Sequence, residues 1–75
     1  MADNAYVKDV PLNQKLNLTV YEAAAYSGIG IVKIREMMRR PDCPFILKAG
    51  EYKQLIRRAE FEKYLDDKAK AGASV

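Results

Sequence analysis

The spacing of apolar and polar residues along the chain predicts three short helices and a β-hairpin. The first helix follows a short extended piece at residues 16–18 and begins at Thr19, because Glu22 lies three residues later. At this spacing the threonine hydroxyl and the glutamate carboxylate cap the first turn of a helix reciprocally. Small apolar residues follow, and Gly28 supplies the glycine that commonly ends a helix. We therefore expect a short helix between Thr19 and Gly28.

A second helix is predicted directly afterwards, over residues 31–40. Its apolar residues Ile34, Met37 and Met38 have the i, i+3, i+4 spacing of a stripe that faces a core. Two short helices joined by a tight turn that contains glycine form a helix-turn-helix unit. The Gly-Ile-Gly sequence of this turn lacks the following lysine and hydroxyl residue of a phosphate-binding loop, which disfavours nucleotide binding.

The second half of the chain predicts a β-hairpin and a closing helix. A turn that contains two prolines stops the second helix. Residues 45–48 and 52–57 then have the composition of two strands, joined by a turn at residues 49–51. The third helix is expected over residues 58–68. Its core contacts at helical spacing are Phe61, Tyr64 and Leu65.

These elements predict one small α+β domain, a winged helix-turn-helix, over residues 16–68. It would consist of a short strand, two helix-turn-helix helices, a β-hairpin wing and a closing helix. Residues 1–15 are polar and aperiodic and are expected to form a flexible arm. Residues 69–75 are small and polar and are expected to form a flexible tail.

Positive charge is concentrated in the middle of the chain. Residues 30–58 contain eight cations and three anions, a net charge of +5, whereas residues 1–29 and 59–75 each carry −1. A cationic segment between nearly neutral ends is typical of a surface that meets a polyanion. Nucleic acid is the leading candidate.

The second helix is the element expected to enter the major groove of DNA, since an α-helix has the right width and its outward side is polar and cationic. The basic hairpin would lie along the DNA backbone or in a minor groove. A charged surface helix and a hairpin that only covers the core are the ordinary alternatives, and they stay open here. The candidate DNA-binding residues are Val32, Lys33, Arg35, Glu36, Arg39 and Arg40 in the helix, and Lys48, Lys53 and Arg57 in the hairpin.

The composition argues against an enzyme and against a metal site. The chain has no histidine, and Cys43 is its single cysteine. The usual metal-ligand sets, an internal disulfide and a histidine-activated nucleophile are therefore excluded. We expect no catalytic residue, no metal and no cofactor, and we interpret Cys43 as a partly buried loop residue. No apolar run approaches the ~20 residues of a membrane span and no secretory signal is evident, which favours a cytoplasmic protein without a membrane partner.

Two groups of motifs carry a resemblance to a known family. The first comprises residues 9–11, 18–26 and 29–30 and contains the element LT-x-x-EAA, which many excisionase-like and MerR-like winged helices share. The second comprises residues 41–45 and 55–65. Together they cover roughly residues 9–66, and the chain resembles the excisionases of conjugative transposons, in the MerR-like winged-helix superfamily. Two features depart from the pattern: the apolar pair Ile31 and Val32 at positions often polar in relatives, and a hairpin one residue longer at Glu51-Tyr52.

The resemblance implies a recombination directionality factor. Such proteins bind sites beside the ends of a mobile element, bend the DNA and help a tyrosine-type integrase to assemble an excision complex. The second helix would read the bases and the wing would contact phosphates. The implied partners are double-stranded DNA and the integrase, and the protein would not cut DNA itself.

Two other functions stay open. A transcriptional regulator of a phage or mobile element would use the same fold on a promoter; ligand sensing of the MerR type is not expected, because no effector domain or long dimerisation helix follows residues 58–68. A protein-interaction adaptor would use the hairpin and third helix, and would show no salt-dependent DNA binding. One module of this size contacts roughly four to five base pairs. Specificity would therefore require further copies of the protein on adjacent DNA sites, or a partner bound beside it.

Overall fold

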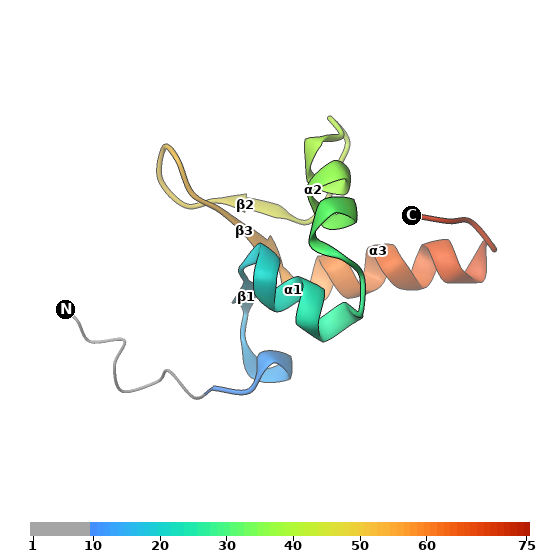
Figure 1. Cartoon of the computed structure of the whole chain (residues 1–75), viewed down its shortest axis with the longest axis horizontal. Helices are drawn as coiled ribbons and strands as arrows, with labels where there is room; N and C mark the ends of the chain where they lie inside the picture. Colours follow the sequence, from blue (N-terminus) through green and yellow to red (C-terminus); the bar gives the residue numbers. More distant parts are fainter. Residues whose placement is uncertain (1–9) are drawn as a thin grey trace.

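The computed structural model describes residues 10–75, and the chain forms the predicted winged helix (Figure 1). Helices α1 (Val20–Ser27) and α2 (Ile31–Arg39) form the helix-turn-helix. Strands β2 (Ile46–Lys48) and β3 (Gln54–Arg57) form the wing with the loop between them, and α3 (Arg58–Lys70) closes the domain. This arrangement confirms the α+β winged helix-turn-helix class. A short 3-10 helix, η2 (Leu12–Gln14), and a short strand, β1 (Asn17–Leu18), precede α1.

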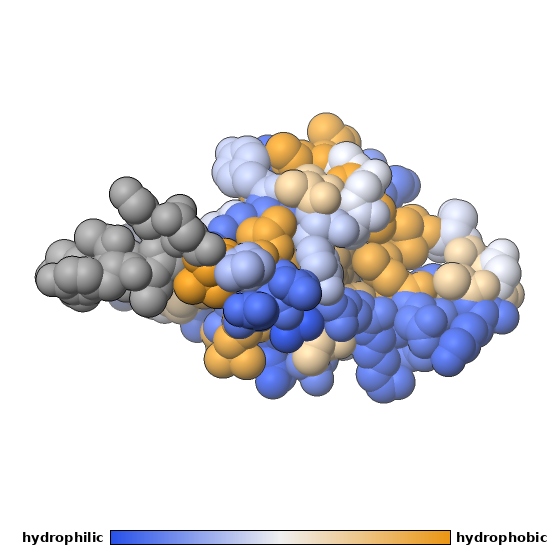
Figure 2. Space-filling view, turned by 90° about the horizontal axis from the view of Figure 1, so that it is seen from below, coloured by the Kyte–Doolittle hydropathy of each residue, from blue (hydrophilic) through white to orange (hydrophobic). Residues whose placement is uncertain are grey.

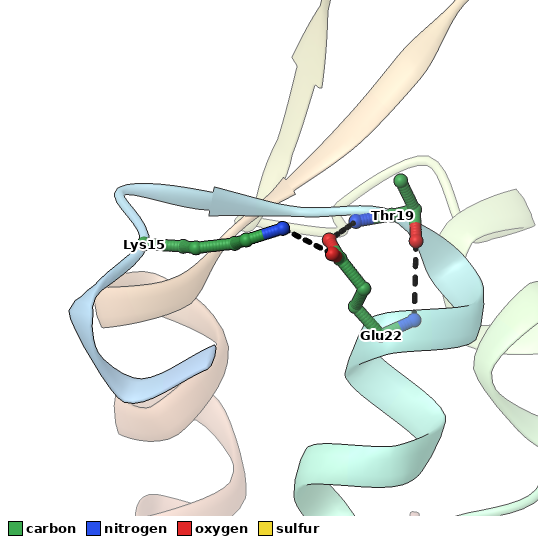
Figure 3. Close-up of polar contacts among 3 residues, drawn as sticks. All are labelled: Lys15, Thr19 and Glu22. Atoms are coloured by element: carbon green, nitrogen blue, oxygen red, sulfur yellow. Dashed lines mark hydrogen bonds and ion pairs between the residues drawn. The ribbon is translucent and has the colours of Figure 1, made fainter. Parts of the chain in front are cut away.

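Helix α1 begins and ends as its sequence predicts. The Thr19 hydroxyl accepts a hydrogen bond from the Glu22 backbone N–H at 3.1 Å, and the Glu22 carboxylate accepts one from the Thr19 N–H at 2.9 Å (Figure 3). Lys15 also donates to this carboxylate. Burial alone would raise the pKa of Glu22, but the hydrogen bonds from Lys15 and Thr19 outweigh burial and lower it. Gly28 ends the helix in the left-handed conformation, with φ 79°.

Replacing Thr19 by alanine is expected to lower the free energy of unfolding by about 1 kcal/mol, because it removes the side-chain acceptor of the capping box. Urea denaturation monitored by circular dichroism measures this change. Thr19→Ser is the matched control, since it keeps the hydroxyl and is expected to unfold at nearly the urea concentration of the unaltered protein. Equal midpoints for Thr19→Ala and Thr19→Ser would contradict a stabilising cap.

The sheet joins the start of the domain to the wing. Its strand order is β1-β3-β2 and both pairings are antiparallel. Leu18 of β1 and Ile46 of β2 lie on either side of Ile56 in the central strand. The wing is thereby attached through β3 to the segment that leads into α1.

Seven apolar side chains form the core. Strands β1 and β3 and the three α-helices each contribute at least one of them, and Phe45 lies directly before β2. The rings of Phe45 and Phe61 meet edge to face, with centroids 5.1 Å apart. Met38, Tyr64 and Leu65 are partly buried against this cluster. The apolar stripes predicted for the second and third helices therefore do face the core. The seven buried residues are Leu18, Ala23, Ile34, Met37, Phe45, Ile56 and Phe61.

Several element boundaries differ from those expected. Strand β1 begins at Asn17 rather than at residue 16, and β2 begins at Ile46 rather than at residue 45. Helix α2 ends at Arg39, and Arg40 is its extended C-cap residue. Strand β3 begins at Gln54 rather than at residue 52, because the wing loop closes through a 2.8 Å hydrogen bond from the Ala49 N–H to the Lys53 carbonyl. Helix α3 continues to Lys70, whose ammonium group pairs with Asp66 at 2.9 Å one turn earlier.

The segments expected to be a flexible arm and a flexible tail contain ordered contacts where they are described. Residues 1–9 of the expected arm lie outside the described residues. The rest of it includes η2, where Leu12 packs against the core. After α3, Gly72 adopts φ 70° and turns the chain, and Val75 packs against the core. The domain limits at residues 16 and 68, and the mobility of both segments, stay predictions.

Candidate nucleic-acid interface

Helix α2 and the wing project to the same side of the molecule, away from α3 (Figure 1). The side of α2 opposite Ile34 and Met37 is open to solvent: Val32 is 73% exposed, and Lys33, Arg35 and Arg39 are exposed as well. Glu36 is only partly buried beside them. The structure therefore places five of the six predicted helix residues on one accessible surface.

A groove of about 410 Å³ separates this surface from the wing. It is lined by Arg35, Met38 and Arg39 of α2 and by Gln54 of β3. Arg35 and Arg39 lie one turn apart, so both border the same groove. The groove therefore has two arginines of α2 on one side, which make this side a cationic surface, and the uncharged Gln54 of the wing on the other.

The far end of the wing carries two exposed lysines and an exposed aromatic ring. Lys48 ends β2, and Lys53 directly precedes β3. Between them, the Tyr52 side chain is 96% exposed. Tyr52 is not among the residues predicted from the sequence, although a large aromatic residue in a turn between two lysines is a signal that could have indicated it. Arg57 lies at the opposite end of β3, where it pairs with Glu60 at 3.5 Å.

The predicted DNA-binding cations differ in whether a carboxylate of the fold already pairs with them. Among residues 10–75, no carboxylate lies within ion-pair distance of Arg35, Arg39, Lys48 or Lys53. Lys33 pairs with Glu36 at 3.1 Å. The Lys33–Glu36 pair and the Arg57–Glu60 pair are both exposed, and exposed ion pairs contribute little to stability. Their cations can therefore exchange a carboxylate for a phosphate at small cost.

Two arginines of the basic segment are held by the fold instead. Arg40 donates to the Tyr64 hydroxyl at 3.1 Å and to the Val75 carbonyl at 2.9 Å, so it faces α3 and the end of the chain rather than the groove. Arg58 donates to the Lys15 carbonyl at 2.7 Å and to Glu62 at 3.1 Å. The sequence predicted Arg40 as part of the DNA-binding helix, and the structure separates it from that surface.

A tyrosine on α1 extends the cationic surface. The Tyr21 side chain is 62% exposed, and its hydroxyl accepts a hydrogen bond from Arg35 Nη2 at 3.1 Å. The guanidinium carbon also lies 5.6 Å from the centroid of the Tyr21 ring. Tyr21 is not among the residues predicted from the sequence, because its contact with Arg35 joins two helices and produces no pattern in the local residue spacing.

Helix α3 carries the acidic residues on another side of the molecule. Seen from below, a hydrophilic band runs along this helix (Figure 2). Its carboxylates pair with nearby cations: Glu62 with Arg58, Asp67 with Lys63 and Asp66 with Lys70. Hydrogen bonds from the Tyr26 hydroxyl and from Arg58 lower the pKa of Glu62 below its ordinary value. This side is therefore electrostatically balanced, unlike the groove.

The described residues contain no group of three or more acidic, histidine or cysteine side chains that could hold a metal ion. Cys43 is partly buried, and burial raises the pKa of its thiol. No helix within residues 10–75 has the length and apolar character needed to cross a bilayer.

Comparison with known proteins identifies the family. The model of a family described as the excisionase from transposon Tn916 matches residues 3–71, a span that includes the helix-turn-helix, the wing and α3. Neither the curated proteins nor the solved structures yield a match. Since the family model covers nearly the whole sequence, the chain belongs to the excisionase family of transposon Tn916.

Proposed function

We propose that the protein binds and bends DNA beside the ends of a mobile element and directs a tyrosine-type integrase toward excision. Its family supports a role as a recombination directionality factor. The observation that carries the DNA-binding part is the groove between α2 and the wing, bordered by arginines without a carboxylate partner among the described residues. The protein supplies binding and DNA shape and does not cut DNA itself.

In this proposal α2 enters the major groove and the wing contacts the adjacent backbone. Arg39 lines the groove and has the bidentate guanidinium that recognises guanine, and the exposed Val32 can contact a thymine methyl group. Lys48 and Lys53 stand at the end of the wing, where an ammonium group neutralises a phosphate without discriminating between bases. Arg40 is assigned to holding α2 against α3.

The small size of the domain favours binding as several copies or beside a partner such as the integrase. One module buries only ~600–1,000 Å² on DNA. Copies on adjacent sites would add specificity and combine their local bends, each of which costs a few kcal/mol that further contacts must offset. The partners we propose are double-stranded DNA, the integrase of the element and further copies of this protein, all meeting in the cytoplasm.

A recombination assay with the integrase of the host element tests this proposal. Adding the protein is expected to raise the yield of excision and to lower that of integration, with protection of DNA near the element ends in a footprint. The Lys48→Ala/Lys53→Ala double variant should lose this stimulation. The matched control is Lys63→Ala/Lys70→Ala, which removes the same charge from exposed positions on α3.

The recombination assay, read together with transcript levels from the element, separates the rival functions. If excision is unchanged while transcripts from a promoter of the element shift, the protein is a transcriptional regulator. If it protects no DNA, the protein-interaction adaptor takes the place of both.

A further inference from the structure

We infer that Tyr21 of α1 and Arg35 of α2 together form a binding site for one phosphate of the DNA backbone. This inference rests on the proposed DNA binding and deepens it. It adds a helix that the proposal so far leaves out, and it gives Arg35 a role different from that of Arg39.

The two side chains already form a unit in the free protein. Arg35 Nη2 donates to the Tyr21 hydroxyl at 3.1 Å, and the guanidinium lies over the aromatic ring at 5.6 Å from its centroid. Tyr21 is 62% exposed and does not belong to the core cluster. Packing of the core therefore does not account for this tyrosine, whereas its contact with Arg35 does.

The unit offers hydrogen-bond donors and an uncompensated positive charge. The Tyr21 hydroxyl accepts from Arg35, so its own proton remains to be donated. A guanidinium has five N–H donors, of which the contact with Tyr21 uses one. No carboxylate among residues 10–75 pairs with Arg35. A phosphate supplies only acceptors and a negative charge, and charge-assisted hydrogen bonds of this kind are the strong ones.

The ring also orders the arginine before any ligand arrives. A free arginine side chain loses considerable rotamer entropy when it binds. Stacking on Tyr21 and the hydrogen bond to its hydroxyl restrict Arg35 in advance, so less entropy is lost on binding.

The position of Tyr21 favours a phosphate over a base edge. Tyr21 lies in the first turn of α1, and the first helix of a helix-turn-helix crosses the DNA backbone while the second enters the groove. Arg39 lies one turn beyond Arg35 and lines the groove beside Gln54. Helix α2 would thus use Arg35 for the backbone and Arg39 for the bases.

Tyr21→Phe tests the site, because it removes the hydroxyl and keeps the ring under the guanidinium. Binding to a specific duplex and to an unrelated duplex should weaken by the same factor, roughly tenfold. The salt dependence should keep its slope, since no charge is lost, whereas Arg35→Ala should reduce the slope by about 0.9. Tyr26→Phe is the matched control: it removes a hydroxyl from the same helix, where that hydroxyl contacts Glu62 of α3, and should leave DNA binding unchanged.

Methylphosphonate substitution then locates the phosphate. Replacing the contacted phosphate by the neutral analogue should weaken binding by the unaltered protein and have a smaller effect on Tyr21→Phe. The inference is overturned if Tyr21→Phe binds like the unaltered protein or if it changes base preference. It is also overturned if no single methylphosphonate reduces the difference in affinity between Tyr21→Phe and the unaltered protein. Failure of the unaltered protein to bind any duplex in a salt-dependent way would instead overturn the proposed function itself.

Discussion

Replacing Phe45 by alanine should leave most of the protein unfolded at 25 °C. Phe45 has no exposed surface, and its ring contacts Phe61 and Tyr64 edge to face, with centroids 5.1 and 5.4 Å away. Removing a buried phenylalanine side chain costs about 3–5 kcal/mol, through lost burial and the cavity left behind. A single core in a domain this small rarely supplies more than about 3–5 kcal/mol of stability. The two quantities are of equal size, so the folded fraction should collapse.

Thermal unfolding followed by far-ultraviolet circular dichroism measures this effect. Tyr52→Ala is the control: it also removes an aromatic ring, but one that is 96% exposed, and it should change stability by no more than about 0.5 kcal/mol. Phe45→Leu should retain a cooperative transition, because it keeps most of the buried volume. A cooperative transition of Phe45→Ala at the temperature of the unaltered protein would show that the core is not centred on this ring.

The affinity for a specific duplex should fall roughly 250- to 1,000-fold between 50 and 200 mM salt. Six cations of the basic segment remain for DNA once Arg40 and Arg58, whose guanidinium groups hydrogen-bond to other parts of the fold, are set aside. If about five of the six neutralise phosphates, log K falls with log salt at a slope of roughly −4 to −5, at about 0.9 per contact. Fluorescence anisotropy of a labelled duplex over this salt range gives the slope, and a slope near zero would refute binding to a polyanion.

Single variants measure how much the wing and α2 each contribute to this affinity. Lys53→Ala should weaken binding to all duplexes alike and reduce the slope by about 0.9. Arg39→Ala should cost about 1–3 kcal/mol of binding free energy and relax preference at particular base pairs. Lys63→Ala on α3 is the control and should change neither property. If Lys53→Ala alters base preference while Arg39→Ala does not, the roles of wing and helix are reversed.

The parts of the fold that could be predicted are those encoded by neighbouring residues. The capping box of Thr19 and Glu22 and the glycine after α1 involve groups at most a few positions apart, so their spacing in the sequence is sufficient. The core stripe of α2 follows from helical periodicity in the same way, and Ile34 and Met37 are indeed fully buried.

The parts that could not be predicted depend on contacts between distant segments. The extended piece at residues 16–18 was predicted, but its antiparallel pairing with β3, which defines β1, was not. The site shows the same division. The cations of α2 and the wing were visible as a charge pattern, but the hydrogen bond from Arg40 to Tyr64 joins residues 24 positions apart and depends on where the fold places α3. The contact between Tyr21 and Arg35 likewise exists only once α1 and α2 cross.

The junction between β3 and α3 determines where the chain can tolerate changes in length as the family diverges. Strand β3 ends at Arg57 and α3 begins at Arg58, with no residue between them. One inserted residue here would rotate α3 by about 100° and carry Phe61 out of the core. Insertions in the exposed loop at residues 50–52 would change only the reach of the wing. Evolution can therefore adjust contact with DNA at the wing loop while the β3–α3 junction keeps its length.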